Sequence, residues 1–187
     1  MTVKAKATIE DLYHVPEHGK AELINGELVR FMPTGKRPSR ASLNIAISLR
    51  AYERINGEGI AVNDNAGFIV DLPHRESFSP DAAWYLGSLD DAESEMDFYE
   101  GAPLFAAEVR SKNDYGEAAE RALKAKRADY FAAGTLVVWD VDLLNEPIIR
   151  VYRFDKPDHP TLYRRGEIAE AEPAVPGWRM PVDDLFQ

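Results

Sequence analysis

The feature that most constrains the fold is a strand–helix–strand succession between residues 104 and 142. Residues 104–109, LFAAEV, form a short apolar run, and residues 135–142, TLVVWDVD, form a second run that is rich in β-branched side chains. Residues 114–134, between these runs, have the spacing of an amphipathic helix. An apolar strand, a long helix and a second apolar strand in this order indicate a βαβ-like crossover, which is typical of an α/β domain.

Antiparallel elements are predicted on either side of this crossover. Residues 21–32 contain two apolar runs around Asn25-Gly26, a pair that favours the type I′ turn of a β-hairpin. Further strands are predicted at residues 59–63, 67–72, 81–86, 148–154 and 161–168. Helices are predicted at 9–15, 39–55 and 114–134, with Ser39 and Asp114 as N-caps, Glu117 in a capping box, and Gly57 and Gly134 at the C-terminal ends. The sequence therefore predicts an α/β fold with a mixed β-sheet and an N-terminal β-hairpin.

Length and composition exclude several classes of protein. The chain has 187 residues and no repeat or linker that divides it, so residues 1–187 are expected to form a single domain. It has no cysteine, which excludes disulfides, thiol nucleophiles and cysteine-based zinc sites, and it contains no HExxH, G-x-S-x-G or Walker motif. It has no run that resembles a signal peptide or approaches the roughly 18 apolar residues of a membrane span. We therefore expect a soluble cytoplasmic protein with no membrane partner.

Charge is distributed unevenly along the sequence. The net charge is −10 and the isoelectric point is near 4.9, which argues against broad, non-specific binding of nucleic acid. Acidic residues crowd one predicted loop: Asp90, Asp91, Glu93, Glu95, Asp97 and Glu100. Basic residues gather in two stretches, Lys36, Arg37, Arg40, Arg50 and Arg54 in one, and Arg110, Lys112, Arg121, Lys124, Lys126 and Arg127 in the other. One interpretation is that all of these groups are solvated surfaces. The alternative is that the basic patches bind an anion, and that the acidic loop holds a cation or steers partners.

Two carboxylates lie at strand ends, where a buried and unpaired charge is costly. Asp81 begins one predicted strand, and Glu108 lies near the end of another. Each has an ordinary explanation: a turn at Asp81, and an ion pair of Glu108 with Arg110 or Lys112. If the two strands are neighbours, their carboxylates form an oxygen-rich pocket for a hard cation such as Mg²⁺. Such an ion activates water and neutralises a phosphate.

The helix at 114–134 supplies cationic groups for this pocket. Lys126 and Tyr130 are four residues apart and lie at one edge of the apolar stripe, so the ammonium of Lys126 can extend towards Glu108. Lys124 points well over a quarter turn away from Lys126. The alternative is that Lys126 is an ordinary surface lysine.

Five segments, in order, match motifs of one known family. AELINGELVRFMP is similar to yELidGel…msP, FSPDAAWY to a PDv segment, and PLFAAEVRSKND to P.lvvEVlSpsd. KRADYFAAGTLVVWDVD is similar to K…Y..aGv..yWlVd, and VPGWRMPVDDLF to lpGf…v.dlF. In these segments, which run nearly end to end, the chain resembles the Uma2 (DUF820) family, grouped with the PD-(D/E)XK nuclease superfamily.

The resemblance implies a restriction-endonuclease-like fold, in which helices flank a mixed central β-sheet. By motif position, the family's site residues fall on Glu22, Asp81, Glu108 and Lys126. Asp81 and Glu108 would bind a divalent metal, Mg²⁺ or Mn²⁺, and Glu22 would add a carboxylate to the metal or its waters. Without the resemblance, Glu22 would be interpreted as a solvent-facing residue of the first hairpin strand. Lys126 would take the place of the lysine that the superfamily often has two residues after the second acid.

Two positions depart from the pattern. Arg110 occupies the place of that superfamily lysine; an arginine stays protonated and cannot act as a base, but it can clamp a phosphate. Lys124 is a second candidate for binding phosphate. Ser42 or a neighbour stands where the family often has a histidine before the first long helix.

These observations lead to two main hypotheses of function. The first is a Mg²⁺-dependent endonuclease that hydrolyses phosphodiester bonds of DNA, and the alternative is a non-catalytic module on the same fold that binds nucleic acid or a protein. A different metal-dependent hydrolase that uses the same pocket is a third. A homodimer is also expected, since two-fold assemblies are the commonest. Its surface would include residues of the outer strands that otherwise close the core: Tyr152, Phe154, Leu162 and Tyr163.

Overall fold

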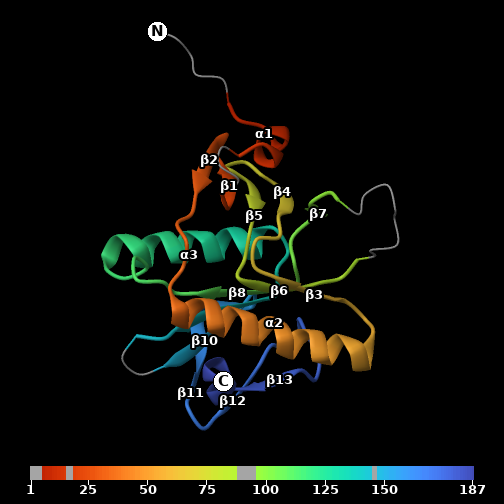
Figure 1. The fold of residues 1–187 in the computed structure, drawn as a ribbon, viewed down its shortest axis with the longest axis vertical. Helices are drawn as coiled ribbons and strands as arrows, with labels where there is room; N and C mark the ends of the chain where they lie inside the picture. The colour runs from red at the N-terminus through yellow and green to blue at the C-terminus, as the bar shows by residue number, and fades with distance from the viewer. Residues whose placement is uncertain (1–5, 16–18, 88–95, 145–146) are drawn as a thin grey trace.

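The computed structural model describes residues 6–15, 19–87, 96–144 and 147–187. Its centre is a six-stranded sheet in the order β11-β10-β9-β8-β6-β3 (Figure 1). The strands span Ile60–Asn63 (β3), Ala82–Tyr85 (β6), Phe105–Val109 (β8), Val137–Asp142 (β9), Ile148–Arg153 (β10) and Lys156–Arg164 (β11). β8 and β9 run parallel and the other pairs are antiparallel, so the predicted crossover and mixed sheet are confirmed.

A second sheet contains the predicted hairpin. Its order is β2-β1-β5-β4-β7, and it lies on the α3 side of the central sheet (Figure 1). The strands span Ala21–Ile24 (β1), Glu27–Arg30 (β2), Phe68–Leu72 (β4), Arg75–Phe78 (β5) and Tyr99–Glu100 (β7). Asn25 and Gly26 have φ of 54° and 71°, the left-handed pair that a type I′ turn requires. β5 and β7 were not predicted, because RESF and YE are too short and polar to stand out as strands.

Two long helices cover opposite faces of the central sheet (Figure 1). The helical segments are Ile9–Tyr13 (α1), Lys36–Asn56 (α2), Glu117–Ala132 (α3) and the 3₁₀ turn Val182–Phe186 (η2). A short ladder, Ile168–Glu170 (β12) with Arg179–Pro181 (β13), packs with α2 and η2 against one face. Within the described ranges, no helix is long and apolar enough to cross a lipid bilayer.

The predicted N-caps of the long helices are wrong. α2 begins three residues before Ser39, and its N-cap is Gly35 without a side-chain hydrogen bond. α3 begins at Glu117 after Gly116, so Glu117 completes no capping box there. Asp114 instead accepts hydrogen bonds from the amide and hydroxyl of Ser111, because the loop after β8 turns before the helix starts. The last predicted strand, 161–168, is also shifted: β11 already begins at Lys156, and β12 begins at Ile168.

Alternation along β8 decides on which side its charged residues lie. Phe105, Ala107 and Val109 join the core beneath α2, whereas Ala106 joins the core shared with α3 and the second sheet. Glu108 therefore shares the face of Ala106 and points towards α3. The same alternation in β6, where Ala83 faces α3, places Asp81 on that side as well.

Candidate active site

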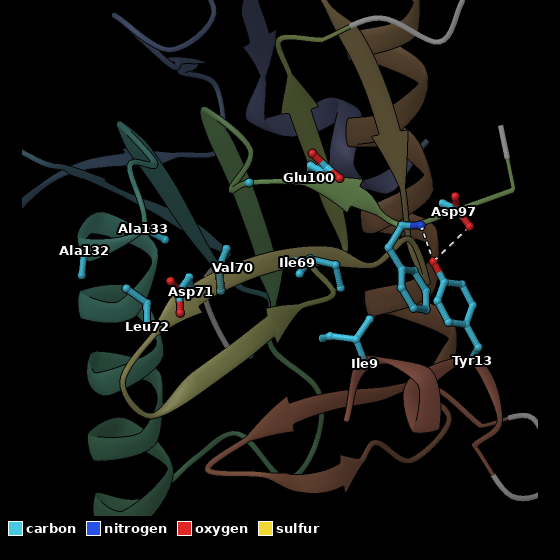
Figure 2. Close-up of a pocket in the computed structure, with 12 residues that line it drawn as sticks. Ile9, Tyr13, Ile69, Val70, Asp71, Leu72, Asp97, Glu100, Ala132 and Ala133 are labelled. Carbon is cyan, nitrogen blue, oxygen red and sulfur yellow. Dashed lines mark hydrogen bonds between the residues drawn. The ribbon is translucent and has the colours of Figure 1, made fainter. Parts of the chain in front are cut away.

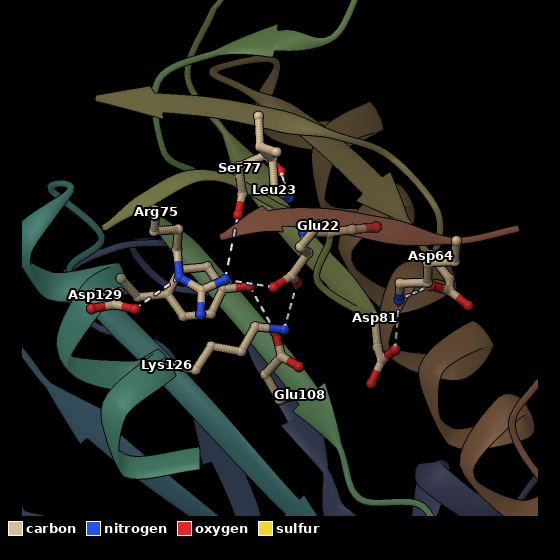
Figure 3. A network of polar contacts seen from close by, with 12 residues as sticks. Glu22, Leu23, Asp64, Arg75, Ser77, Asp81, Glu108, Lys126 and Asp129 are labelled. Carbon is tan, nitrogen blue, oxygen red and sulfur yellow. Dashed lines mark hydrogen bonds and ion pairs between the residues drawn. The ribbon is translucent and has the colours of Figure 1, made fainter. Parts of the chain in front are cut away.

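Asp81 and Glu108 come from neighbouring antiparallel strands. Ala82 of β6 pairs with Ala107 of β8, so Asp81 lies beside Glu108 at the end of this ladder. The backbone amide of Val109 donates to Asp81 Oδ2 at 2.7 Å and fixes the orientation of that carboxylate. The side chains of Asp81 and Glu108 are 22% and 19% exposed, so both reach the surface. Figure 3 shows the two carboxylates with the charged groups around them.

Lys126 extends from α3 to Glu108, as the helical spacing predicts. Its Nζ lies 2.8 Å from Glu108 Oε1 and 2.8 Å from Glu22 Oε1 (Figure 3). Tyr130, one turn further along α3, donates its hydroxyl to the same Glu108 oxygen at 2.7 Å. Burial opposes the charge of Lys126, but the carboxylates of Glu108 and Glu22 outweigh it and raise the pKa of the ammonium. Lys126 is therefore a permanent cation at neutral pH and cannot serve as a base.

Glu22 is buried rather than solvent-facing, with 1% of its surface exposed. Besides Lys126, its carboxylate accepts from Arg75 Nη1 at 2.6 Å and from the amide of Ser79 at 3.1 Å. Burial alone would raise its pKa, but Lys126 and Arg75 hold the pKa of Glu22 below its ordinary value. Both oxygens are thus already engaged by donors, so the geometry favours Glu22 as the anchor of Lys126 over the metal-ligand role that the resemblance implies.

A chain of charges continues from Glu22 to the surface. Arg75 Nε donates to Asp129 Oδ2 at 2.8 Å, and Asp129 Oδ1 lies 2.7 Å from Nε2 of His74. Arg75 and Asp129 are largely buried, whereas half of the His74 side chain is exposed. This chain holds α3 against β5 and thereby keeps Lys126 at its place.

Lys20 completes the site from just before β1. Its Nζ lies 2.5 Å from Asp64 Oδ1 and 3.3 Å from Asp81 Oδ1. The ring of Phe31 lies near both ammonium groups, 6.0 Å from Lys20 Nζ and 5.6 Å from Lys126 Nζ. The sequence contained no signal for Lys20 or Asp64, because a single lysine and a loop aspartate match no motif.

Ser42, which stands where the family often has a histidine, contacts the backbone of Asp81. Its hydroxyl donates to the backbone carbonyl of Asp81 at 2.7 Å, so α2 is tied directly to the strand that carries the carboxylate. This contact brings the first turns of α2 beside the site. Lys36, Arg37 and Arg40 are exposed on these turns.

The charge of the donor set and the number of its ligands both suit a magnesium-type ion. The connected charged groups carry an excess of two negative charges with His74 neutral: the cations are Lys20, Arg75 and Lys126, and the carboxylates are Glu22, Asp64, Asp81, Glu108 and Asp129. Burial raises the pKa of Glu108. The attraction of Lys126 lowers this pKa, but repulsion from Asp81 and Glu22 adds to the effect of burial, and the pKa stays above its ordinary value. A further cation would offset this repulsion and stabilise the charged carboxylate.

The number of ligands also fits such an ion. No group of three or more histidine or carboxylate side chains is arranged to enclose a metal within the part of the chain that the structure describes. Asp81 and Glu108 would therefore be two protein ligands, with water and substrate oxygens completing the shell. Mg²⁺ commonly binds in this way, through one or two carboxylates plus phosphate and water.

Arg110 and Lys124, the predicted phosphate-binding residues, are not brought to this site. Arg110 is buried, and its Nε and Nη2 donate to the two oxygens of Asp140 at 2.6 and 2.7 Å, while it also pairs with Glu120 of α3. Glu108 has Lys126 as its cationic partner instead of Arg110. Lys124 is exposed and pairs with Asp158 of β11 at 2.8 Å.

A sizeable hollow of the described surface lies away from these residues. A cavity of about 750 Å³ lies between α1, β4, β7 and the end of α3, and Figure 2 shows residues that line it. No predicted site residue lines it. At its rim, Tyr13 stacks on Phe98 with ring centroids 4.0 Å apart. Asp97 and Glu100 of the predicted acidic loop lie here, whereas its other members, Asp90, Asp91, Glu93 and Glu95, lie outside the described residues.

The expected dimer surface is mixed in character. Phe154 and Leu162 are exposed, while Tyr152 and Tyr163 are partly buried against the core. Arg127 lies over the ring of Tyr152, with Cζ 3.6 Å from the centroid. The homodimer stays a prediction.

Comparisons with known proteins agree with the fold. The family model of Uma2, described as "Putative restriction endonuclease", matches residues 8–183. A crystal structure of a "putative nuclease belonging to DUF820" from Anabaena variabilis superposes with a TM-score of 0.72 at 17% sequence identity. The match covers 96% of this chain and 97% of that one, and it supports the restriction-endonuclease-like α/β fold. A search of curated proteins gives no match. Because the family model spans almost the whole sequence, this chain belongs to the Uma2 family.

Proposed function

We propose that this protein is a Mg²⁺- or Mn²⁺-dependent endonuclease that hydrolyses phosphodiester bonds of DNA. The observation that carries the proposal is the convergence of Asp81 and Glu108 from adjacent strands with the ammonium of Lys126, 2.8 Å from Glu108. Asp81 and Glu108 would hold the cation. A divalent cation bound there supplies an activated water and neutralises the charge of the phosphate.

The surrounding side chains have roles that follow from their contacts. The Lys126 ammonium is held by Glu22 and Glu108, so it is preorganised to stabilise the negative charge that develops on the phosphate. Tyr130 fixes the orientation of Glu108 through its hydroxyl. During hydrolysis, a water oxygen bonds to phosphorus as the bond to the leaving sugar oxygen breaks. The proton that water releases passes to solvent or to the leaving oxygen.

The distribution of exposed charge supports a nucleic-acid substrate despite the net charge of −10. Lys36, Arg37 and Arg40 are exposed on the turns of α2 that Ser42 ties to Asp81. A local basic surface of this kind binds the phosphate backbone next to a catalytic site. We therefore assign the DNA backbone to this end of α2.

The proposal is tested by nicking of supercoiled plasmid with Mg²⁺ or Mn²⁺. Asp81→Asn and Lys126→Met should each lower the rate by about 100-fold or more, because Asp81 would hold the metal ion and Lys126 would stabilise the charge on the reacting phosphate. Lys124→Met is the matched control, since Lys124 is exposed and pairs with Asp158 away from the site, and it should cut like the wild type. Equal nicking by all four proteins would show a contaminating nuclease and refute the proposal.

One observation favours the second candidate, a non-catalytic binding module. Lys126, Glu22 and one oxygen of Glu108 already satisfy one another. Such a module would bind plasmid without cutting it, and binding would persist in Asp81→Asn. Mobility-shift measurements on the same variants distinguish this outcome from catalysis.

A further inference from the structure

Lys20 holds an unusual position for a cation beside a candidate metal site. Its ammonium lies between Asp64 Oδ1 at 2.5 Å and Asp81 Oδ1 at 3.3 Å, and its side chain is 21% exposed. Neither the sequence motifs nor the family pattern assigns it a role.

The two oxygens of Asp81 are engaged differently. Oδ2 accepts from the backbone amide of Val109 at 2.7 Å, a contact that belongs to the β6–β8 ladder. Among the described residues, Lys20 is the one polar partner of Oδ1. The oxygen that is free of the backbone, and so best placed to bind a metal, is the one that the lysine holds.

An ammonium and a divalent cation cannot share that oxygen at low cost. Mg²⁺ binds oxygen at about 2.0–2.1 Å, so an ion on Asp81 Oδ1 would stand within a few ångströms of the present Nζ position. Two cations at that separation repel strongly in a partly buried site. Asp64 already holds the Lys20 ammonium at 2.5 Å, so the flexible side chain can move away from Asp81 without leaving the site.

We propose that Lys20 competes with the divalent cation for Asp81 and thereby makes metal binding depend on the substrate. Without DNA, the ammonium neutralises Asp81 and keeps the affinity for metal low. With DNA, a backbone phosphate near the site attracts the ammonium away from Asp81 and offsets its repulsion of the incoming ion. The displaced lysine then lies at the phosphate that the metal contacts. This role rests on the proposed metal site.

The experiment is a calorimetric titration of Mn²⁺ into the DNA-free protein. Lys20→Met keeps the aliphatic stem and removes the charge, and it should bind Mn²⁺ at least about tenfold more tightly than the wild type, because the competing cation is gone. Lys20→Arg restores a cation and should return the affinity to within a few-fold of the wild type. Lys124→Met removes an exposed charge elsewhere and should change nothing. Lys20→Gln is a second neutral variant for the case that Lys20→Met folds poorly, and it should also bind Mn²⁺ at least about tenfold more tightly than the wild type.

A second titration contains a short DNA duplex with phosphorothioate linkages, which resist cleavage. The duplex should tighten Mn²⁺ binding to the wild type by about tenfold, and to Lys20→Met much less, because in that variant there is no ammonium for the phosphate to withdraw. An equal effect of the duplex on both proteins would overturn the substrate dependence.

The outcomes separate this role from the proposed function. If the wild type binds Mn²⁺ and the neutral variants bind it no more tightly, competition by Lys20 is refuted and the metal site stands. If no variant binds Mn²⁺ at millimolar concentration, both are refuted. If the neutral variants bind Mn²⁺ more tightly but the wild type never cuts DNA, competition stands and the nuclease activity fails.

Discussion

The buried ion pair of Arg110 and Asp140 allows a direct test of whether Arg110 stabilises the fold or binds phosphate. Arg110 stands where the superfamily often has a catalytic lysine, yet it is buried and forms a forked pair with Asp140 through two contacts of 2.6 and 2.7 Å. Both residues are almost fully buried, at 5% and 3% exposure. We therefore predict that the pair matters for stability and that neither residue matters for binding phosphate.

The magnitudes follow from what each substitution leaves behind. Arg110→Met leaves the Asp140 carboxylate buried, with Arg150 Nη1 3.8 Å away and outside hydrogen-bond distance. Removal of one partner of a buried pair costs about 3–5 kcal/mol of unfolding free energy, a large share of the roughly 5–15 kcal/mol that stabilises an ordinary domain. Asp140→Leu should cost less, because Arg110 keeps the half-exposed Glu120 as a partner.

The double variant Arg110→Met/Asp140→Leu should lie within about 1 kcal/mol of the wild type, since two apolar side chains of similar volume replace two desolvated charges. Glu120 then turns to solvent at little cost, because its side chain is already 53% exposed. Urea denaturation of the four proteins gives the coupling free energy as a double-mutant cycle. The reasoning is refuted if the double variant is as unstable as the two single changes added together. If the double variant folds like the wild type but loses plasmid binding, Arg110 clamps phosphate after all.

Three further predictions concern the site, the core beneath α2 and the turn of the first hairpin. Lys126→Met leaves the largely buried Glu108 without its cation. A carboxyl group whose pKa is raised by folding favours the folded state at low pH and penalises it as pH rises. The variant should therefore lose more stability, relative to the wild type, near about pH 8 than near about pH 5 in urea titrations, and an equal loss at both values would contradict this. Trp178→Ala should cost about 3–5 kcal/mol by the same method, because Trp178 is buried and stacks on Trp139 at 4.9 Å; a loss below about 1 kcal/mol would show that the core refills the space. Gly26→Ala should lower the free energy of unfolding by about 1–2 kcal/mol, because φ is 71° and the new Cβ would lie 2.9 Å from the Lys6 side chain. An unchanged denaturation midpoint would mean that the turn adjusts to the methyl group.

Much of the fold was predictable because it depends on local periodicity. The parallel crossover from β8 through α3 to β9 follows from two apolar runs separated by one helix. The hairpin follows from Asn25-Gly26, the pair that adopts the required left-handed turn. The boundaries were less predictable: α3 starts at Glu117 instead of Asp114, because the preceding loop forms its own hydrogen bonds to Asp114.

The candidate site was predictable in part. The reach of Lys126 towards Glu108 follows from helical spacing once β8 and α3 are known to be neighbours. The burial of Glu22 was not predictable from its own strand, where a glutamate in a hairpin normally faces water. It depends on Arg75 of β5, a strand that the sequence pattern did not reveal.

The sequence by itself indicated most of the elements, though not β5 and β7. Its motifs pointed to the family and, through that resemblance, to Glu22, Asp81, Glu108 and Lys126 as a candidate site. Only the tertiary structure decided which charges meet. Arg110 pairs with Asp140 because β9 lies beside β8, and Lys20 reaches Asp81 because the first hairpin folds over the end of β6. The physical reason is the sequence separation of the interacting groups. Helix and strand signals act over a few residues, whereas these ion pairs join side chains that are tens of residues apart in the chain.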